Sequence, residues 1–361
     1  MSDCIIIGGG LIGMLTAREL SESGFAVTIL DRHAVGKESS WAGGGILSPL
    51  YPWRYPDPVN ELAVWGQKDY PDLAKKLAIQ TGIDPEWTQS GLLLLDEEAI
   101  KPAVSWAVSQ NSQVEVLERD AIRACEQQLG PYGEKAVWLP EIAQIRNPRL
   151  IQALRRSLEV SGVDIKEHVE VESLLVENGQ IQGVTSSVGK LMAGKIVIAG
   201  GAWSASLLSE HGLSIPVKPV RGQMLLYRTE PGLISRIVLS NGRYVIPRRD
   251  GHVLVGSTVE DVGFDKSTTD QALAELKFAA ESMIPKLASH DVIRHWAGLR
   301  PGSAEGVPLI SKLPDIDGLY INAGHFRNGV VLGPASARLL TDIILDRRPI
   351  VHSSPYAVKW T

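Results

Sequence analysis

The chain has 361 residues, which is too long for one small core and suits two interlocked domains. Hydrophobic residues make up 44% and charged residues 21%, as in an ordinary globular protein, and the net charge is −5. The basic residues are scattered and no apolar run approaches the roughly 20 residues that span a bilayer, so we expect no nucleic-acid partner and no integral membrane contact.

The first 31 residues predict a strand, a tight turn, a helix and a second strand. The continuous apolar run Cys4–Ile7 is typical of a parallel strand that is covered on both faces. Leu11, Leu15 and Leu20 share one helical face, and residues 26–30 form a second apolar run, which ends at Asp31. This order of elements is the one that opens a dinucleotide-binding domain.

The turn between the first strand and the helix carries a glycine pattern. Gly8, Gly10 and Gly13 satisfy G-x-G-x-x-G. Gly8 permits the tight turn, Gly10 lets the backbone approach a pyrophosphate, and Gly13 lets helix and strand pack closely, while the helix N-terminus offers unpaired N–H groups. Asp31 is placed to accept both ribose hydroxyls. The pattern predicts a dinucleotide site, but it does not separate FAD from NAD.

Residues 39–199 combine a small-residue loop with helices and strands. The loop at 39–47 is rich in glycine and serine, and its small residues let backbone amides reach a pyrophosphate or a flavin ring. Residues 59–80 predict a helix with Pro71 as a kink or break, and Asn147-Pro148 predicts a cap followed by a helix to 160. Strands are expected at 92–95, 165–171 and 195–199, with a hairpin turn at Asn178-Gly179.

The remainder of the chain changes character twice. Residues 217–260 alternate apolar and polar positions around glycine turns, which predicts an antiparallel sheet. Thr268 and Gln271 resemble a capping box that opens a helix to about 287. Residues 318–345 predict a strand, a glycine-bearing turn and a helix, whose N-terminus could stabilise negative charge on a reduced flavin. This last turn and the loop at 39–47 favour FAD over NAD.

Parallel-sheet signals therefore occur at the start, the middle and the end of the chain, with antiparallel material between them. We expect an α/β fold in which a Rossmann-like FAD-binding domain carries an inserted antiparallel-sheet substrate domain. The FAD-binding domain is expected to comprise residues 1–85, 145–215 and 296–361, and the substrate domain residues 86–144 and 216–295.

Six motifs of the sequence carry a family resemblance: GGGLIG, SSWAGGGIL, VIAGGAW, RYVIPR, WAGLRPG and GHFRNGVVLGP. In this order they resemble the D-amino-acid oxidase superfamily, and within it most closely the glycine oxidases. The resemblance implies the D-amino-acid oxidase fold with non-covalently bound FAD. It places the cofactor contacts, besides the glycines above, at Leu11, Ile12, Asp31, Arg32, Ser39, Ser40, Gly44, Gly45, Ile46, Val169 (with Val171 as the alternative), His325, Phe326, Arg327, Asn328, Gly329, Val330 and Val331.

The same resemblance implies a site for an amino-acid carboxylate. Arg300 matches the arginine that binds the carboxylate, and a planar guanidinium can do so through two parallel hydrogen bonds. Tyr244 matches a tyrosine whose hydroxyl assists, and Arg327 matches a second arginine close to the same site. Surface or packing roles remain the alternatives for all three. His325 is expected to position the flavin, with catalytic base as a second interpretation.

The implied activity is oxidative deamination of glycine or another small amine or amino acid. Hydride would pass from the α-carbon to flavin N5, O2 would be reduced to H2O2, and the imine could feed thiamine thiazole synthesis. A same-fold D-amino-acid or sarcosine dehydrogenase with a non-oxygen electron acceptor is the alternative.

Three further expectations concern the cellular compartment, metal binding and oligomeric state. Cys4 and Cys125, the only two cysteines, suggest a reducing compartment, so we expect the cytoplasm. The eight histidines show no metal-ligand spacing, so we expect no metal. Whether the chain forms a homo-oligomer cannot be read from the sequence.

Overall fold

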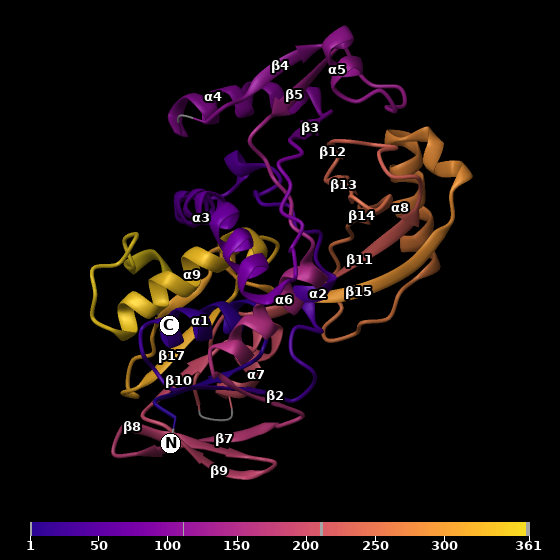
Figure 1. The fold of residues 1–361 in the computed structure, drawn as a ribbon. Coiled ribbons are helices and arrows are strands. Elements are labelled where there is room, and N and C mark those ends of the chain that lie inside the picture. The colour runs from indigo at the N-terminus through magenta and orange to yellow at the C-terminus, as the bar shows by residue number, and fades with distance from the viewer. Residues whose placement is uncertain (1, 111, 210–211, 359–361) are drawn as a thin grey trace.

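The computed structural model describes residues 2–110, 112–209 and 212–358. A six-stranded sheet forms the lower half of the molecule in Figure 1. Its strands run in the order β16 (Leu309–Lys312), β17 (Leu319–Ala323), β10 (Lys195–Ile198), β1 (Cys4–Ile7), β2 (Val27–Asp31) and β6 (Asp164–Glu167). All neighbouring pairs are parallel except β16 with β17. The sheet thus collects strands from the beginning, the middle and the end of the chain.

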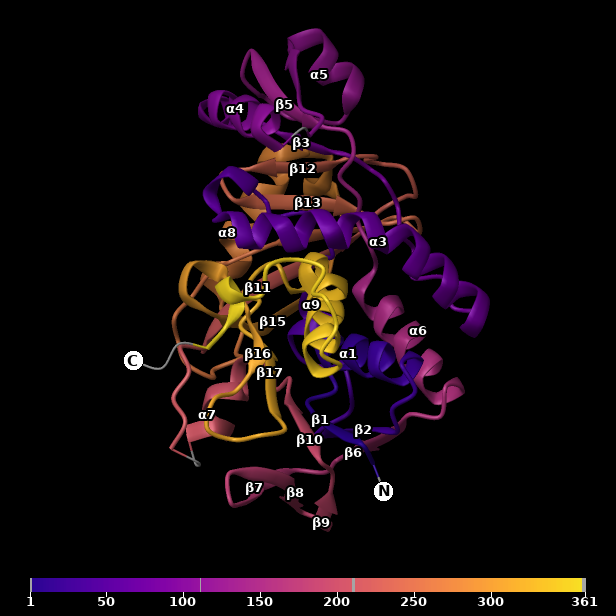
Figure 2. The same cartoon turned by 90° about the vertical axis from the view of Figure 1, so that its left-hand side faces the viewer.

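Both faces of this sheet are covered, which explains why its central strands are apolar throughout. On one face pack α1 (Leu11–Glu22), α3 (Asp57–Thr81), α6 (Asn147–Val160) and α9 (Gly329–Ile344). Figure 2 shows α9, in yellow, beside α1. On the other face lie α7 (Ser204–Ser209) and a small sheet of β7 (Val171–Glu177), β8 (Gln180–Ser186) and β9 (Gly189–Met192). Ile6 faces the first core and Ile5 the second, as alternation along a strand requires.

An eight-stranded sheet forms the other half of the molecule (Figure 1). Its order is β15 (Val292–Gly302), β11 (Lys218–Arg228), β14 (His252–Gly256), β13 (Arg243–Pro247), β12 (Ile237–Ser240), β3 (Leu92–Leu94), β5 (Lys135–Leu139) and β4 (Glu115–Glu118). Strands β11 to β15 pair antiparallel, as the alternating pattern predicts. The predicted domain boundary at 295/296 falls inside β15, which belongs to this sheet over its whole length.

The remaining helices cover this second sheet or connect the two halves. They are α2 (Ser39–Ala42), α4 (Ile100–Gln110), α5 (Arg119–Cys125), α8 (Asp270–Met283) and the short 3-10 helices Pro52–Arg54, Glu97–Ala99, Gly201–Trp203, Pro285–Ser289 and Ala304–Gly306. A further 3-10 helix, Ser354–Tyr356, packs in the core of the first sheet. In the part of the chain that the structure describes, no helix has both the length and the apolar character of a membrane span. No group of possible metal ligands gathers there either.

Pro71 lies within α3, so of the two predicted alternatives the break is excluded and the kink is retained. Two other local predictions need correction. Asn147 is the first residue of α6 rather than its cap, because its side chain turns away and donates to the Ser40 carbonyl at 2.9 Å. The cap of α8 is Thr269, whose hydroxyl accepts from the Ala272 amide, so the predicted capping box is one residue early. The hairpin at Asn178-Gly179 is confirmed, with both residues at positive φ, as a tight two-residue turn requires.

Candidate functional site

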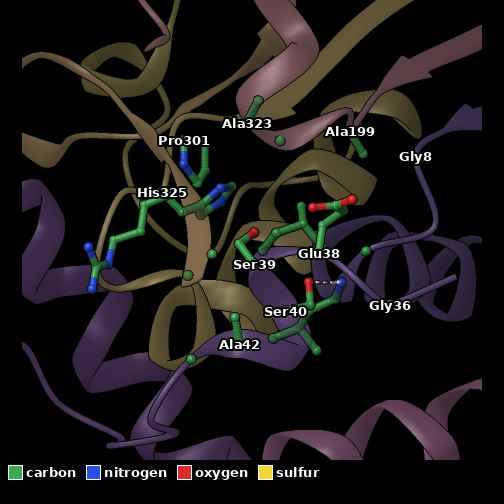
Figure 3. Close-up of a pocket in the computed structure, with 18 of the residues that line it drawn as sticks. Gly8, Gly36, Glu38, Ser39, Ser40, Ala42, Ala199, Pro301, Ala323 and His325 are labelled. Atoms are coloured by element: carbon green, nitrogen blue, oxygen red, sulfur yellow. Dashed lines mark hydrogen bonds between the residues drawn. The ribbon is translucent and has the colours of Figure 1, made fainter. Parts of the chain in front are cut away.

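One continuous cavity is lined by residues of both large sheets. It begins at the turn between β1 and α1 and ends against β11, β13 and β15. In Figure 3, Ser39 and Ser40 of α2 lie across this cavity from Ala323, His325 and Pro301. The cavity therefore joins the nucleotide-type turn near the N-terminus to the strands that carry Tyr244 and Arg300.

The turn after β1 leaves no room for side chains. Gly8 has φ +109°, and a Cβ there would collide with the Ala199 carbonyl. A Cβ at Gly13 would overlap the Gly8 carbonyl oxygen, so α1 can approach β1 this closely only with glycine at this position. Gly10, the N-cap of α1, makes no side-chain cap, and the first turn has no acidic residue. The positive end of the helix dipole thus faces the cavity, where a pyrophosphate would fit.

Asp31 and Ser40 flank this helix end. The two carboxylate oxygens of Asp31 accept the backbone N–H groups of Gly9 and His33, both at 2.8 Å. Burial raises the pKa of the Asp31 carboxyl, although these hydrogen bonds oppose the rise. Ser40 Oγ accepts the Leu11 N–H at 2.8 Å, the bond drawn as a dashed line in Figure 3. Asp31 keeps lone pairs for ribose hydroxyls, whereas the Leu11 amide already has an acceptor.

A second helix N-terminus reaches the cavity from the other side. The N-cap of α9 is Asn328, which makes no side-chain cap, and the first turn holds no acidic residue. The side chain of Asn328 is buried, and its Nδ2 has no partner within the described chain. An unpaired buried amide and an uncapped helix end both suit a ligand that carries hydrogen-bond acceptors and negative charge. The two helix ends together fit a flavin dinucleotide, with its phosphates at α1 and its ring at α9.

His325 lies just before α9 and lines the cavity. Its Nε2 donates to Ser336 Oγ at 3.0 Å, because that hydroxyl gives its own proton to the Leu332 carbonyl. Burial lowers the pKa of His325 to about 3, so the ring is neutral near pH 7. A neutral ring fixed in this way suits a positioning role and makes His325 a weak base.

Arg300 projects from β15 over Gly222 of β11, where a Cβ would overlap its guanidinium. Of its five N–H donors, two on Nη1 serve the carbonyls of Thr258 at 3.0 Å and Arg221 at 3.3 Å. One on Nη2 serves Ser257 Oγ at 2.8 Å. The Nε donor and the second Nη2 donor have no acceptor among the described residues. Two neighbouring donors thus remain for a carboxylate from a ligand.

The positive charge of Arg300 also has no carboxylate partner among the described residues. Burial, reinforced by the nearby cation Arg327, lowers the pKa of Arg300 to about 10. The neighbouring Arg221, in contrast, pairs with both Glu260 and Asp265. Within residues 2–110, 112–209 and 212–358, Arg300 donates only to two carbonyls and a hydroxyl. A half-buried guanidinium that lines a cavity and lacks a carboxylate partner favours an anionic ligand.

Tyr244 and Arg327 complete this end of the cavity. The Tyr244 hydroxyl donates to Met224 Sδ at 3.5 Å, and a thioether is a weak acceptor. A ligand oxygen can therefore replace that partner at little cost. Arg327 follows Phe326, which has φ +47°, and makes no hydrogen bond within the described chain. Both side chains line the cavity together with Arg300.

Nearly all the predicted site residues line this one cavity. Among them are Gly8, Gly10, Leu11, Ile12, Asp31, Arg32, Ser39, Ser40, Gly44, Gly45, Ile46, Val169, Tyr244, Arg300, His325, Phe326, Arg327, Asn328, Gly329 and Val330. Two predicted contacts do not reach it. Gly13 instead allows α1 to pack on β1, and Val331 is completely buried in the core shared by α3 and α9. The side chain of Val331 thus packs in the core, one position beyond the residues of this turn that line the cavity.

The end of the cavity formed by Tyr244, Arg300 and Arg327 is called the carboxylate end below. Sequence reasoning missed three of its residues: Gly222, Met224 and Ser257. Each acts on Arg300 or Tyr244 from a neighbouring strand. Gly222 and Met224 lie on β11, which pairs with β15, and Ser257 directly follows β14, which pairs with β13. Only the arrangement of the sheet reveals these residues.

Comparison with known proteins agrees with this geometry. The family model for FAD dependent oxidoreductases matches residues 3–343. A protein of Pseudomonas aeruginosa named glycine oxidase is 46% identical over 354 residues, covering 98% of this chain and 97% of that protein. Crystal structures of glycine oxidases from Bacillus cereus and Geobacillus kaustophilus have TM-scores of 0.91 and 0.93 at 31% and 27% identity. They cover 97% and 99% of this chain, and this chain covers 96% and 98% of them.

These findings confirm the resemblance to the glycine oxidases, the predicted fold class and FAD as the cofactor. They also confirm the prediction of a flavin enzyme over the alternative of an NAD-dependent one. Because one family model spans almost the entire sequence and close relatives align end to end, this chain belongs to the family of FAD-dependent oxidoreductases.

Proposed function

We propose that this protein oxidatively deaminates glycine or another small amine or amino acid, with O2 as the electron acceptor and H2O2 as a product. The observation that carries the proposal is the pair of unused donors on Arg300, an uncompensated cation at the end of the cavity. A carboxylate supplies the missing charge and accepts both donors at once. The names of the similar proteins support glycine as the preferred substrate.

The side chains bind and orient the substrate before any bond changes. Arg300 binds the carboxylate through Nε and Nη2, while its Nη1 stays on two backbone carbonyls that hold the guanidinium still. Tyr244 moves its proton from Met224 Sδ to a carboxylate oxygen. The carboxylate is then fixed at two points, so the α-carbon has a defined position relative to α9. This positioning is the main contribution that side chains make to such a reaction.

A flavin held between the N-termini of α1 and α9 would supply the redox chemistry, as acceptor of the hydride from the α-carbon and donor of electrons to O2. The uncapped N-terminus of α9 stabilises the negative charge that reduction creates. His325, neutral and bound to Ser336, takes no proton. The substrate amine reacts in its neutral form and needs no protein base. We further propose that the imine feeds thiamine thiazole synthesis in the cytoplasm. We also propose the domain boundaries predicted above, except that the boundary at 295/296 moves to the end of β15 at Gly302.

Anaerobic mixing of the purified yellow protein with glycine tests the reaction directly. The proposal predicts that the flavin absorbance bleaches and returns when O2 is admitted. Unchanged absorbance with glycine, sarcosine and small D-amino acids would disprove amine oxidation. Bleaching without O2 uptake, but with turnover on an artificial dye, would favour the alternative dehydrogenase.

Arg300→Ala tests the site itself. Loss of a charge-assisted pair in a water-poor site should weaken substrate binding at least about ten-fold while FAD binding survives. Wild-type steady-state kinetics in this variant would remove Arg300 from the substrate site.

A further inference from the structure

Arg248, like Arg300, is a guanidinium without a carboxylate partner among the described residues, and it is buried. It follows β13 directly, is 8% exposed and does not line the cavity. Nη1 donates to Gln144 Oε1 at 2.7 Å and to the Ile145 carbonyl at 3.2 Å, and Nη2 donates to the Gly44 carbonyl at 2.7 Å. Burial lowers the pKa of Arg248 to about 10, so the side chain is charged near pH 7. Burying a cation costs folding free energy unless it is both hydrogen-bonded and paired with an opposite charge. Arg248 has the hydrogen bonds but no paired carboxylate among the described residues.

The position of Arg248 relates it to the substrate residue Tyr244. Tyr244, Ile246 and Arg248 alternate along the chain and so point to one face of the sheet. Gly44 lies against all three: a Cβ on it would be 3.1 Å from Ile246 and 3.2 Å from the Tyr244 hydroxyl, and its carbonyl accepts from Arg248. One strand face therefore carries a substrate-binding hydroxyl and an anchor for the loop that borders the flavin.

The hydrogen bond from Arg248 also fixes the direction of a peptide group. In a trans peptide the carbonyl of Gly44 and the N–H of Gly45 point in opposite directions. With the carbonyl held toward Arg248, the Gly45 N–H points away from the strand. It has no acceptor within the described chain, and Gly45 lines the cavity.

Gly45 is held on its other side as well. Its φ is +76°, and a Cβ would overlap the Ile145 carbonyl, so the residue cannot shift toward segment 144–147. The Ile145 amide donates to the Gly45 carbonyl at 2.8 Å. The loop is thus clamped between the strand face and this segment, and Arg248 contacts both sides of the clamp.

We propose that Arg248 is a positioning residue that orients the Gly44–Gly45 peptide so that the Gly45 N–H donates to the flavin ring. It acts through Gly44 and touches neither substrate nor cofactor. The same contact sets the spacing between the flavin loop and Tyr244. The inference depends on FAD, which the family establishes, and rests on the proposed function only where substrate kinetics are measured.

The variants Arg248→Met and Arg249→Met form a matched pair. Arg249 is the next residue but exposed, and it pairs with Asp84 at 2.8 Å instead of reaching the loop. Titration of the apoprotein with FAD should give about ten-fold weaker binding for R248M, because one charge-assisted hydrogen bond no longer orders the loop. R249M should bind FAD as the wild type does. The flavin absorption maximum should shift in R248M alone, and R248K, which keeps one donor for Gly44, should recover part of both effects.

With glycine, R248M should lower kcat more than it raises KM, since the carboxylate site on Arg300 is intact. If wild-type protein fails to oxidise glycine, the FAD titration and the spectrum still decide the role of Arg248. Wild-type FAD affinity and spectrum in folded R248M would overturn the proposal.

A measurement on the wild-type protein tests the proposal even if the R248M variant does not fold. Amide hydrogen exchange of Gly45 should slow when FAD is added to the apoprotein, because the flavin provides the acceptor. Equal exchange rates with and without FAD would overturn the inference irrespective of the variants.

Discussion

The two ends of the cavity are built by different means. At the nucleotide end, backbone groups of the turn and the N-terminus of α1 face the pyrophosphate position, and a Cβ at Gly8 or Gly13 would overlap the backbone. At the carboxylate end, side chains face the ligand position. Tyr244 and Arg300 come from separate strands, Ser257 directly follows a third strand, and each side chain is hydrogen-bonded to a neighbour. A backbone site is destroyed by adding atoms, whereas a side-chain site is weakened step by step as hydrogen bonds are removed.

Gly13→Val tests that contrast most severely. The added side chain would overlap the Gly8 carbonyl, so α1 must move off β1 and the helix end leaves the pyrophosphate position. We expect no flavin to remain on the purified protein, measured as the ratio of 450 nm to 280 nm absorbance. Gly194→Val is the matched control, because a Cβ there meets nothing within 4 Å. Full flavin content in Gly13→Val would show that the nucleotide end is more compliant than its packing indicates.

Gly222→Ala makes the same kind of change at the carboxylate end. Its methyl group would overlap the Arg300 guanidinium, which must then rotate away from its three acceptors. We expect kcat/KM for glycine to fall about a hundred-fold, comparable to roughly 2.7 kcal/mol, with FAD content unchanged. Loss of FAD together with activity would mean that the two ends are not independent.

The pH dependence of carboxylate binding separates the two ends by charge. Acetate has no amine group, so the ligand itself does not change its charge in the alkaline range. The affinity of the protein for acetate therefore reports on the charge of Arg300. Because the pKa of Arg300 is lowered to about 10, the cation is lost as the pH rises through that value. Acetate affinity should be constant from about pH 6 to 9 and fall about four-fold by pH 10.5. An arginine with an ordinary pKa would keep the affinity flat over this range. The flavin spectrum without acetate, recorded over the same range, is the control for changes in the cofactor.

The same contrast explains what the sequence could predict. The nucleotide end lies within 31 consecutive residues, so glycine spacing and apolar runs predict its strand, turn and helix directly. Tyr244 and Arg300 are 56 positions apart by their numbering, and only family motifs suggested that they meet. Ser257 and Gly222 carry no motif, and their roles follow from strand register. The side chain of Val331 does not line the cavity, because one position along a helix turns a side chain by about 100°, from cavity to core.

Ser257→Ala should have the smallest effect and tests how much a single neighbour contributes. Ser257 Oγ accepts from Nη2 of Arg300, and its carbonyl, which the substitution keeps, accepts from Arg243 at 2.8 Å. Losing one of three acceptors leaves the guanidinium held by Thr258 and Arg221 but freer to tilt. We expect KM for glycine to rise about five-fold, or about 1 kcal/mol, with kcat within two-fold, because the guanidinium keeps two of its three acceptors. Ser289→Ala, which removes an exposed hydroxyl, is the control. If kcat fell while KM stayed constant, Ser257 would act on the reacting atoms, and the carboxylate end would extend further toward the flavin than the contacts of Arg300 indicate.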